Sequence, residues 1–226
     1  MIAVICAMEV ELERILQAME HISRETVAGV ECTLGTLEGC DAVAAVCSVG
    51  KVSAAQCTQA ILSRYAPQAV FHSGIAGAVA PDVGHMDVVC ARELTYRDVS
   101  EEVKRGFLPM GGYFLADPRL VSAVLRAEPE CKLGCIATGD LFVSSAEEKK
   151  RLWEDYHALC ADMESAAVAQ VCTANRTPFA VIRCISDLAD GDAHEDYASF
   201  ERAAAEKSAN ILRSALKSIT ESNIFN

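Results

Sequence analysis

Short apolar runs alternate with longer helical patterns along most of the chain, and this alternation restricts the possible folds more than any other feature. The run IAVICAM (2–8) is rich in β-branched residues, which predicts a buried strand. Leu12, Ile15, Leu16 and Met19 then recur at the spacing of one helical face. Because such units repeat, we expect an α/β fold: a three-layer α/β/α sandwich around a central mixed, mainly parallel twisted sheet.

The same patterns place the remaining elements. Further strands are predicted at residues 31–39, 41–50, 69–78, 87–96, 133–140, 158–163 and 178–187. Further helices are predicted at residues 51–65, 117–127, 144–156 and 164–175, with a last one whose apolar stripe runs from Tyr197 to Ile219. Residues 99–114, rich in Gly and Pro, are predicted to form an irregular, mobile loop, and residues 220–226 to fray. No linker or repeat is visible, so residues 1–226 are interpreted as one domain.

Composition excludes several classes of partner. The chain carries a formal net charge of -12, whereas nucleic acids and anionic membrane surfaces select basic patches. No apolar run approaches the roughly 20 residues of a membrane span. The 11 cysteines are scattered, mostly inside apolar runs, which favours buried thiols in a reducing cytoplasm over a disulfide framework. Their spacing does not match a zinc site, so no metal is expected.

Carboxylates follow three of the predicted strands. Glu9 and Glu11 follow the first strand, Asp162 and Glu164 end the strand at 158–163, and Asp187 ends the strand at 178–187. Each has an ordinary explanation, because acids favour the first turn of a helix and aspartate favours turns. In open α/β sheets, however, ligands bind beyond the carboxyl ends of the strands. Acids at several strand ends therefore indicate a binding crevice.

A glycine turn follows a fourth strand. In SGIAGA, Gly74 and Gly77 would allow a ligand to approach the backbone closely, although a short glycine pair is also typical of an ordinary turn. Together with the three strands that are followed by acids, this turn gives four strand ends that could converge on one crevice.

Five segments, in order, carry a resemblance to a known family: AMEVELE, SGIAGA, TGDLFV, ADMESAAVAQVC and VIRCISDLAD. Together they resemble the 5′-methylthioadenosine/S-adenosylhomocysteine nucleosidases of the nucleoside phosphorylase superfamily, over residues 1 to about 217. The resemblance implies a nucleoside phosphorylase-like fold and hydrolysis of the N-glycosidic bond of these two nucleosides, with release of adenine and a 5-thioribose. It implies no metal or organic cofactor, and it implies a homodimer in which residues 99–114 lie near the partner's pocket.

The resemblance also implies roles for individual residues. Asp187 would protonate N7 of adenine, Glu11 would activate the attacking water, and Glu164 would accept hydrogen bonds from the ribose hydroxyls. The other implied site residues are Met163 and Asp162 beside Glu164, Phe142 and Val143 against adenine, Ala76 and Gly77 through their backbone, Ser186 and Arg183 orienting the acid and the base, and an apolar pocket of Ala7, Met8, Met163, Tyr197 and Phe200.

Two departures and three alternatives remain open. Ile75 stands where many relatives have serine, and Arg97 where some have histidine, which affects the ribose and 5′ contacts. A purine nucleoside phosphorylase would need a basic cradle for phosphate, and only Arg183 suggests one. A hydrolase of another 5′-modified nucleoside, such as a futalosine-type substrate, is the second alternative. A nucleoside-binding sensor without chemistry is the third.

Overall fold

The computed structural model describes residues 1–222 of the chain. The strands are β1 (Ile2–Cys6), β2 (Glu20–Val27), β3 (Val30–Leu37), β4 (Cys40–Val46), β5 (Val70–Ala78), β6 (Val88–Tyr96), β7 (Tyr113–Leu115), β8 (Lys132–Thr138), β9 (Ala158–Asp162) and β10 (Phe179–Asp187). The helices are α1 (Glu9–Ala18), α2 (Lys51–Tyr65), α3 (Glu101–Phe107), the 3-10 turn η1 (Pro109–Gly112), α4 (Pro118–Ala127), α5 (Ala146–Tyr156), α6 (Ser165–Ala174) and α7 (Ala193–Ser222).

The ten strands form one sheet in the order β10-β6-β8-β9-β5-β1-β4-β3-β2, with β7 paired to β6 and β10 also paired to β5. The pairs β1–β4, β1–β5, β5–β10, β6–β8 and β8–β9 are parallel. Antiparallel pairs add β2, β3 and β7 and join β10 to β6 and β5 to β9. The predicted fold, with a mixed sheet that is mainly parallel at its centre, is confirmed.

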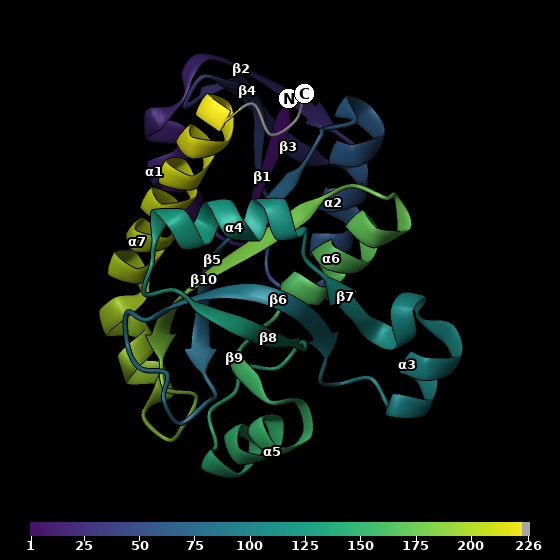
Figure 1. Ribbon diagram of the computed structural model, residues 1–226, viewed down its shortest axis with the longest axis vertical. Helices are drawn as coiled ribbons and strands as arrows, with labels where there is room; N and C mark the ends of the chain where they lie inside the picture. Colours follow the sequence, from purple (N-terminus) through teal and green to yellow (C-terminus); the bar gives the residue numbers. More distant parts are fainter. Residues whose placement is uncertain (223–226) are drawn as a thin grey trace.

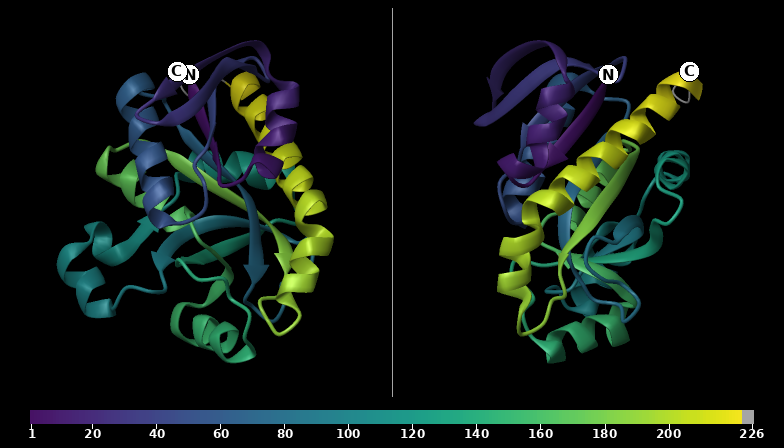
Figure 2. Two further views of the ribbon diagram at one scale, coloured as in Figure 1. Left: turned by 180° about the vertical axis from the view of Figure 1, so that it is seen from behind. Right: turned by 90° about the vertical axis from the view of Figure 1, so that its left-hand side faces the viewer.

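Helices lie on both sides of this sheet (Figures 1 and 2). Helix α7 packs along β5 and β10 and contacts α1 and α4, while α2 and α6 pack on each other. Strands β1 and β10 are buried along their whole length. Since β10 also carries Arg183, Ser186 and Asp187, the sheet holds charged and polar groups in the interior, where each needs a partner.

Two segments differ from the sequence prediction. Strand β2 was not predicted, because its residues are mostly exposed and show no alternation of apolar and polar positions. Residues 99–114 are not irregular, since they form α3, η1 and β7. Ser100 caps α3 by accepting from the Val103 N–H, and Lys104 is fully buried over the ring of Tyr156 at 4.3 Å. A buried lysine is rare, so the sequence pattern could not indicate this anchor.

Helix α3 stands out from the rest of the chain at the right of Figure 1. Residues 220–222 continue α7, and the rest of the segment predicted to fray lies outside the described residues. Within the described part of the chain, no helix is both long and apolar enough to cross a membrane.

Candidate active site

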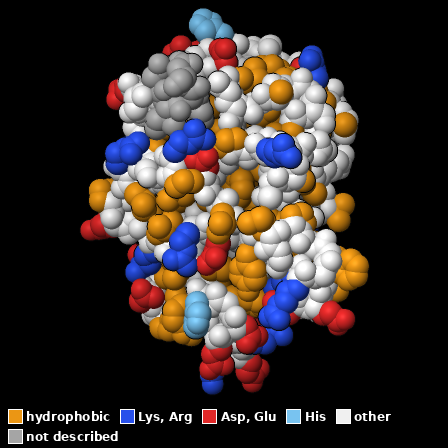
Figure 3. Space-filling view, turned by 45° about the vertical axis from the view of Figure 1, so that its right-hand side comes forward, with side chains coloured by type: hydrophobic (Ala, Val, Ile, Leu, Met, Phe, Trp, Pro, Cys, Tyr) orange, Lys and Arg blue, Asp and Glu red, His pale blue; other side chains and the backbone are white. Residues whose placement is uncertain are grey.

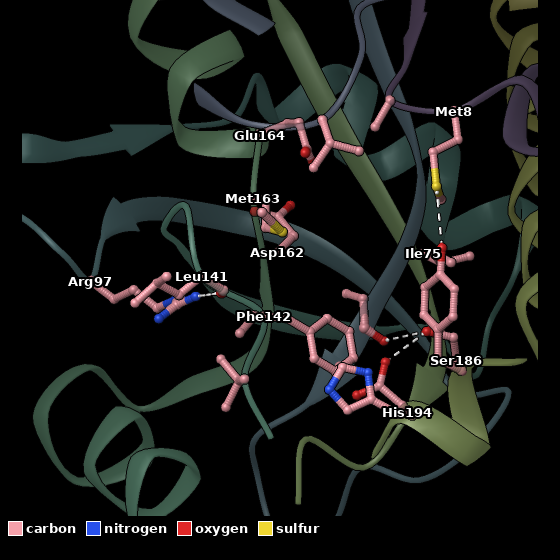
Figure 4. Close-up of a pocket in the computed structure, with 18 residues that line it drawn as sticks. Met8, Ile75, Arg97, Leu141, Phe142, Asp162, Met163, Glu164, Ser186 and His194 are labelled. Atoms are coloured by element: carbon pink, nitrogen blue, oxygen red, sulfur yellow. Dashed lines mark hydrogen bonds between the residues drawn. The ribbon is translucent and has the colours of Figure 1, made fainter. Parts of the chain in front are cut away.

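The strand ends named above converge on one cavity. It has a volume of about 310 Å³ and is drawn in Figure 4. Its described lining residues are Ala7, Met8, Val49, Ile75, Ala76, Gly77, Arg97, Leu141, Phe142, Val143, Ala161, Asp162, Met163, Glu164, Ser186, Asp187, His194 and Tyr197. They come from the carboxyl ends of β1, β5, β9 and β10, from the segments that follow β4, β6 and β8, and from the start of α7. The topology brings these ends together because β5 pairs with β1, β9 and β10.

Most of the predicted site residues line this cavity, and three do not. Glu11 and Arg183 are buried behind its wall, and Phe200 stacks on His85 with ring centroids 4.5 Å apart. The sequence did not indicate Val49, Leu141, Ala161 or His194, whose side chains complete the lining.

Glu11 is held in α1 by three backbone donors. Its Oε2 accepts from the N–H groups of Ala7 (2.8 Å) and Met8 (3.0 Å), and its Oε1 accepts from Ile75 N–H (2.9 Å). Burial raises the pKa of Glu11, while the Arg183 charge and these hydrogen bonds oppose the rise. A carboxylate offers about four acceptor sites, so three donors leave room for about one more.

Arg183 is buried on β10 among carboxylates. Its Nε donates to Asp162 at 2.9 Å, and one Nη2 hydrogen lies towards Ser165 Oγ at 2.9 Å. The same Nη2 contacts His72, whose pKa is lowered to about 3 by burial and by the Arg183 charge, so this imidazole is neutral. Burial opposes the charge on Arg183, but Asp162 and two glutamates raise its pKa.

Asp162, at the end of β9, is a structural partner of that arginine. It also accepts from Thr138 Oγ1 at 2.6 Å and from the hydroxyl of Ser165. Burial alone would raise the pKa of Asp162, but Arg183 and the hydroxyl donors hold it below its ordinary value. Asp162 is therefore ionised and committed to protein groups.

Glu164 lies at the start of α6, and its surroundings raise its pKa, whereas those of Asp162 lower the pKa of that residue. Its Oε1 accepts from Gly50 N–H at 2.8 Å, and its Oε2 is 3.9 Å from Arg183 Nη2. Burial and then the Asp162 charge raise the pKa of Glu164 to about 7. Figure 4 shows Glu164 at the edge of the cavity, near Met163 and Asp162. A carboxylate with few protein partners is available to a ligand.

Asp187 ends β10 against the glycine turn. Its Oδ2 accepts from Ser186 Oγ at 2.9 Å, and its Oδ1 accepts from Ala189 N–H at 3.0 Å. A Cβ atom on Gly77 would lie 2.6 Å from Asp187 Oδ1, so the close approach requires glycine. Burial raises the pKa of Asp187, and the two hydrogen bonds oppose that rise.

An aromatic group forms one wall of the cavity. The ring of Phe142 stacks on His194, with centroids 4.7 Å apart, and meets Tyr197 edge-on at 6.0 Å. The Tyr197 hydroxyl donates to Glu201 at 2.7 Å and lies 3.2 Å from the sulfur of Met8 (Figure 4). His194 is exposed on the first turn of α7, in a polar stretch with no sequence signal for a site.

The fold and this cavity define a class of protein: an α/β protein whose strand ends enclose a pocket for a small ligand with a planar ring and hydroxyl groups. Aromatic side chains bind planar rings, and carboxylates bind hydroxyls. The sequence profile of the phosphorylase superfamily matches residues 1–217. The chain belongs to that superfamily.

Individual relatives point to one branch of it. The 5′-methylthioadenosine/S-adenosylhomocysteine nucleosidase of Bacillus subtilis is 34% identical over 230 residues, covering 96% of this chain and 99% of the relative. That of Shewanella halifaxensis is 33% identical with the same coverage. The Neisseria meningitidis nucleosidase in complex with methylthio-immucillin-A has a TM-score of 0.91 at 32% identity, over 96% of this chain and 98% of that chain. These relatives confirm the resemblance to the 5′-methylthioadenosine/S-adenosylhomocysteine nucleosidases that the sequence motifs indicated.

A second kind of neighbour bears on the substrate. Futalosine hydrolase of Helicobacter pylori has a TM-score of 0.90 at 29% identity, over 96% of this chain and 97% of that chain. The fold alone therefore does not separate the two activities.

Proposed function

We propose that this protein hydrolyses the N-glycosidic bond of 5′-methylthioadenosine and S-adenosylhomocysteine, releasing adenine and the 5-thioribose product. The proposal is supported by three acids that lie far apart in the sequence. Glu164 and Asp187 line one cavity, and Glu11 lies directly behind its wall, bound to the backbone N–H groups of three lining residues. Most relatives compared above carry this activity in their names. The whole chain, residues 1–226, acts as one domain, which is consistent with a single sheet.

Asp187 is the general acid in this mechanism. As the bond breaks, negative charge grows on the purine, and the carboxylic acid protonates N7. The raised pKa of Asp187 keeps a proton available at higher pH than for an ordinary aspartate, and Ser186 and Ala189 orient the carboxyl group. A positioned acid of this kind contributes typically ~10²–10⁴-fold in rate.

Glu11 is the general base. Three backbone N–H groups fix its carboxylate and leave one acceptor site, which takes the proton of the attacking water. Arg183 lies beside it and favours its charged form against burial. Ile75 lacks the side-chain hydroxyl of a serine, and it contributes to the site through its backbone N–H, which holds the base.

Glu164 binds the ribose hydroxyls, with the backbone of Met163 beside it. As the bond breaks, positive charge develops on the sugar, and an ionised Glu164 stabilises that charge in a site that excludes water. With a pKa of about 7, this group is present in both its neutral and its charged form near neutral pH, and hydrogen bonds from the sugar diol would favour the charged form.

The base and the 5′ substituent occupy the two remaining sides of the cavity. Phe142 stacks on adenine, and the backbone of Val143 pairs with the edge of the base. Ala76 and Gly77 contribute backbone groups near Asp187. Met8, Met163 and Tyr197 offer an apolar, polarisable wall for the thioether, which suits sulfur.

Water rather than phosphate is the second substrate. Among the described residues that line the cavity, the basic side chains are Arg97 and His194. Arg97 is bound to Glu148 at 2.5 Å, and His194 is stacked on Phe142. Arg183, behind the wall, is bound to Asp162. A phosphate dianion needs a cradle of free donors and would also meet the charge of Glu11.

The direct test is adenine release from 5′-methylthioadenosine in phosphate-free buffer, followed by chromatography. S-adenosylhomocysteine and futalosine are run in parallel. Release that requires added phosphate would identify a phosphorylase, and release from futalosine alone would identify the other hydrolase. Binding of methylthioadenosine without turnover would identify a sensor.

We also infer a homodimer formed through the α3 side of the molecule. The described residues expose several large apolar side chains there or at the cavity mouth: Val49 (50%), Val52 (81%), Val103 (41%), Phe107 (81%), Met110 (65%), Leu115 (57%) and Leu141 (69%). Figure 3 shows apolar side chains spread over this side of the molecule. Such exposure marks an interaction surface, and a second copy would bring α3 to the partner's 5′ pocket.

The cytoplasm is the proposed location. All eleven cysteines are free, and ten of them are buried. Reduced, buried thiols are typical of a reducing compartment.

A further inference from the structure

Arg97, just beyond β6, lines the cavity but directs its guanidinium at the protein. Its side chain is 3% exposed. Nη2 donates to the carbonyl oxygens of Gly139, at 3.2 Å, and Leu141, and Nη1 donates to Glu148 Oε1 at 2.5 Å. Figure 4 shows the contact between Arg97 and Leu141 on the side of the cavity away from Met8. One side chain thus holds three acceptors at once.

The segment Gly139–Leu141 is also tied from its other sides. Gly139 N–H donates to the Asp162 carbonyl at 3.0 Å, and Asp140 N–H donates to Asp98 at 3.0 Å. The Asp140 carboxylate accepts from the backbone N–H of Lys51 at 2.8 Å. Phe142 and Val143 follow directly in the chain, so these hydrogen bonds determine where both residues lie. Arg97 holds this segment from a position in the cavity lining.

Gly139 lies flat against the arginine side chain. A Cβ atom on Gly139 would lie 2.9 Å from Arg97 Cγ, 3.0 Å from Nε and 3.1 Å from Cζ. Real Cβ atoms rarely approach so closely, so any other residue at 139 would push the guanidinium away. The sequence TGDLFV thus contains a glycine that is needed for side-chain packing, and its partner is 42 positions away in the chain.

The charge of Arg97 is neutralised within the protein. Glu148 lies in the first turn of α5, where the Ser145 hydroxyl accepts from its N–H at 3.2 Å. A buried guanidinium without such a partner would be strongly destabilising. The planar fork suits two carbonyls and a carboxylate together, whereas a lysine ammonium is a point charge with poorer geometry for all three. Both terminal nitrogens of Arg97 are therefore bound to protein acceptors, and its Nε, which has no hydrogen-bond partner among the described residues, is buried.

We propose that Arg97 is a positioning residue: with Glu148 it fixes the segment Gly139–Leu141 and thereby sets the base-binding side of the cavity formed by Phe142 and Val143. The inference rests on the proposed function in taking that side to bind adenine. It predicts that loss of the guanidinium weakens binding of the base and leaves the ribose side, built from Glu164 and Met163, intact.

The experiment compares Arg97→Gln with wild type in methylthioadenosine hydrolysis and in inhibition by two products. Misplacement by about 1 Å costs up to ~100-fold, so we expect KM to rise about 10–100-fold with a smaller change in kcat. Inhibition by free adenine should weaken by a similar factor, whereas inhibition by methylthioribose should not change. A purely structural defect would weaken both.

Two further variants keep the inference testable if Arg97→Gln folds poorly. Gly139→Ala should give the same selective loss of adenine affinity, because its methyl group displaces the guanidinium. Glu148→Gln should give a smaller loss in the same direction. Lys150→Gln, which removes only an exposed pair with Glu154 on the same helix, is the matched control and should behave as wild type.

Amide hydrogen exchange of the peptide that contains residues 139–143 separates this inference from the proposed function. We expect faster exchange there in Arg97→Gln and Gly139→Ala than in wild type. Unchanged exchange, or methylthioribose inhibition weakened as much as adenine inhibition, would overturn the inference. Wild-type protein that neither releases nor binds adenine would overturn the proposed function, and the exchange measurement would still show whether Arg97 holds the segment.

Discussion

Replacing Glu164 by glutamine is predicted to make the protein more stable and less active. Glu164 is 5% exposed, and burial, followed by the charge of Asp162, raises its pKa from 4.5 to about 7. A carboxyl group whose pKa is higher in the folded than in the unfolded chain stabilises the fold while it is protonated. Its contribution is complete below pH 4.5 and is lost as the pH rises through about 7.

The size of the effect follows from the two pKa values. Between pH 5 and pH 8.5, ionisation of Glu164 lowers the free energy of unfolding by roughly 2.5 kcal/mol. The unfolding entropy of a globular protein is about 2.1 cal/mol/K per residue, so for this chain the loss corresponds to about 5 °C in Tm. Glutamine cannot ionise and still offers an oxygen to Gly50 N–H, so the variant should not show this loss.

The assay is thermal unfolding of wild type and Glu164→Gln at pH 5 and pH 8.5, with adenine release measured at pH 7. Glu9→Gln, which changes an exposed glutamate on α1, is the matched control. We expect the variant to gain Tm over wild type at the higher pH while its hydrolysis falls severely, since ribose binding needs the carboxylate. An identical change in Tm with pH in wild type and Glu164→Gln would refute the reasoning. A mere modest rise in KM would show that Glu164 stabilises substrate and transition state equally.

Three other substitutions test the remaining assignments. Asp187→Asn should lower adenine release by ~10²–10⁴-fold without loss of fold, because its amide can donate to Ser186 and still accept from Ala189 N–H. The control Asp192→Asn, in the same loop, should stay active. Near wild-type rates for Asp187→Asn would exclude Asp187 as the acid. Glu11→Gln should reduce adenine release by a similar factor in single-turnover measurements, whereas retained turnover would transfer the role of base to another group. Phe107→Glu should shift sedimentation towards the monomer, since it places a charge on a side chain that is 81% exposed on α3, and an unchanged sedimentation coefficient would contradict the proposed interface.

The positions of the acids could be predicted from the sequence because each follows a strand that is itself recognisable. The runs before Glu11, Glu164 and Asp187 are short and apolar, and the carboxyl ends of such strands form the binding edge of an α/β sheet. Their surroundings could not be predicted in the same way. Asp162 and Glu164 are two positions apart, yet the pKa of one is lowered and that of the other is raised. That difference depends on which of them Arg183 contacts closely.

Features without a local pattern were missed. Strand β2 is exposed on the edge of the sheet and has no alternation to detect. Helix α3 depends on a buried Lys104 that pairs with Glu101 and packs on Tyr156, a residue from another element. His194 joins the cavity only because the start of α7 lies beside Phe142. Phe200, expected in the apolar pocket, lies on the same helix but faces His85 instead.

The sequence by itself determined the order and type of most elements, because hydrophobic periodicity is a local property and differs between strands and helices. It also placed acids at the strand ends. Only the tertiary structure decided which groups surround each acid, how far its pKa moves, and that Arg97 is bound by Gly139, Leu141 and Glu148 rather than free for a ligand. The physical reason is that burial and Coulomb interactions depend on distances in space, and the groups concerned are separated by many residues along the chain.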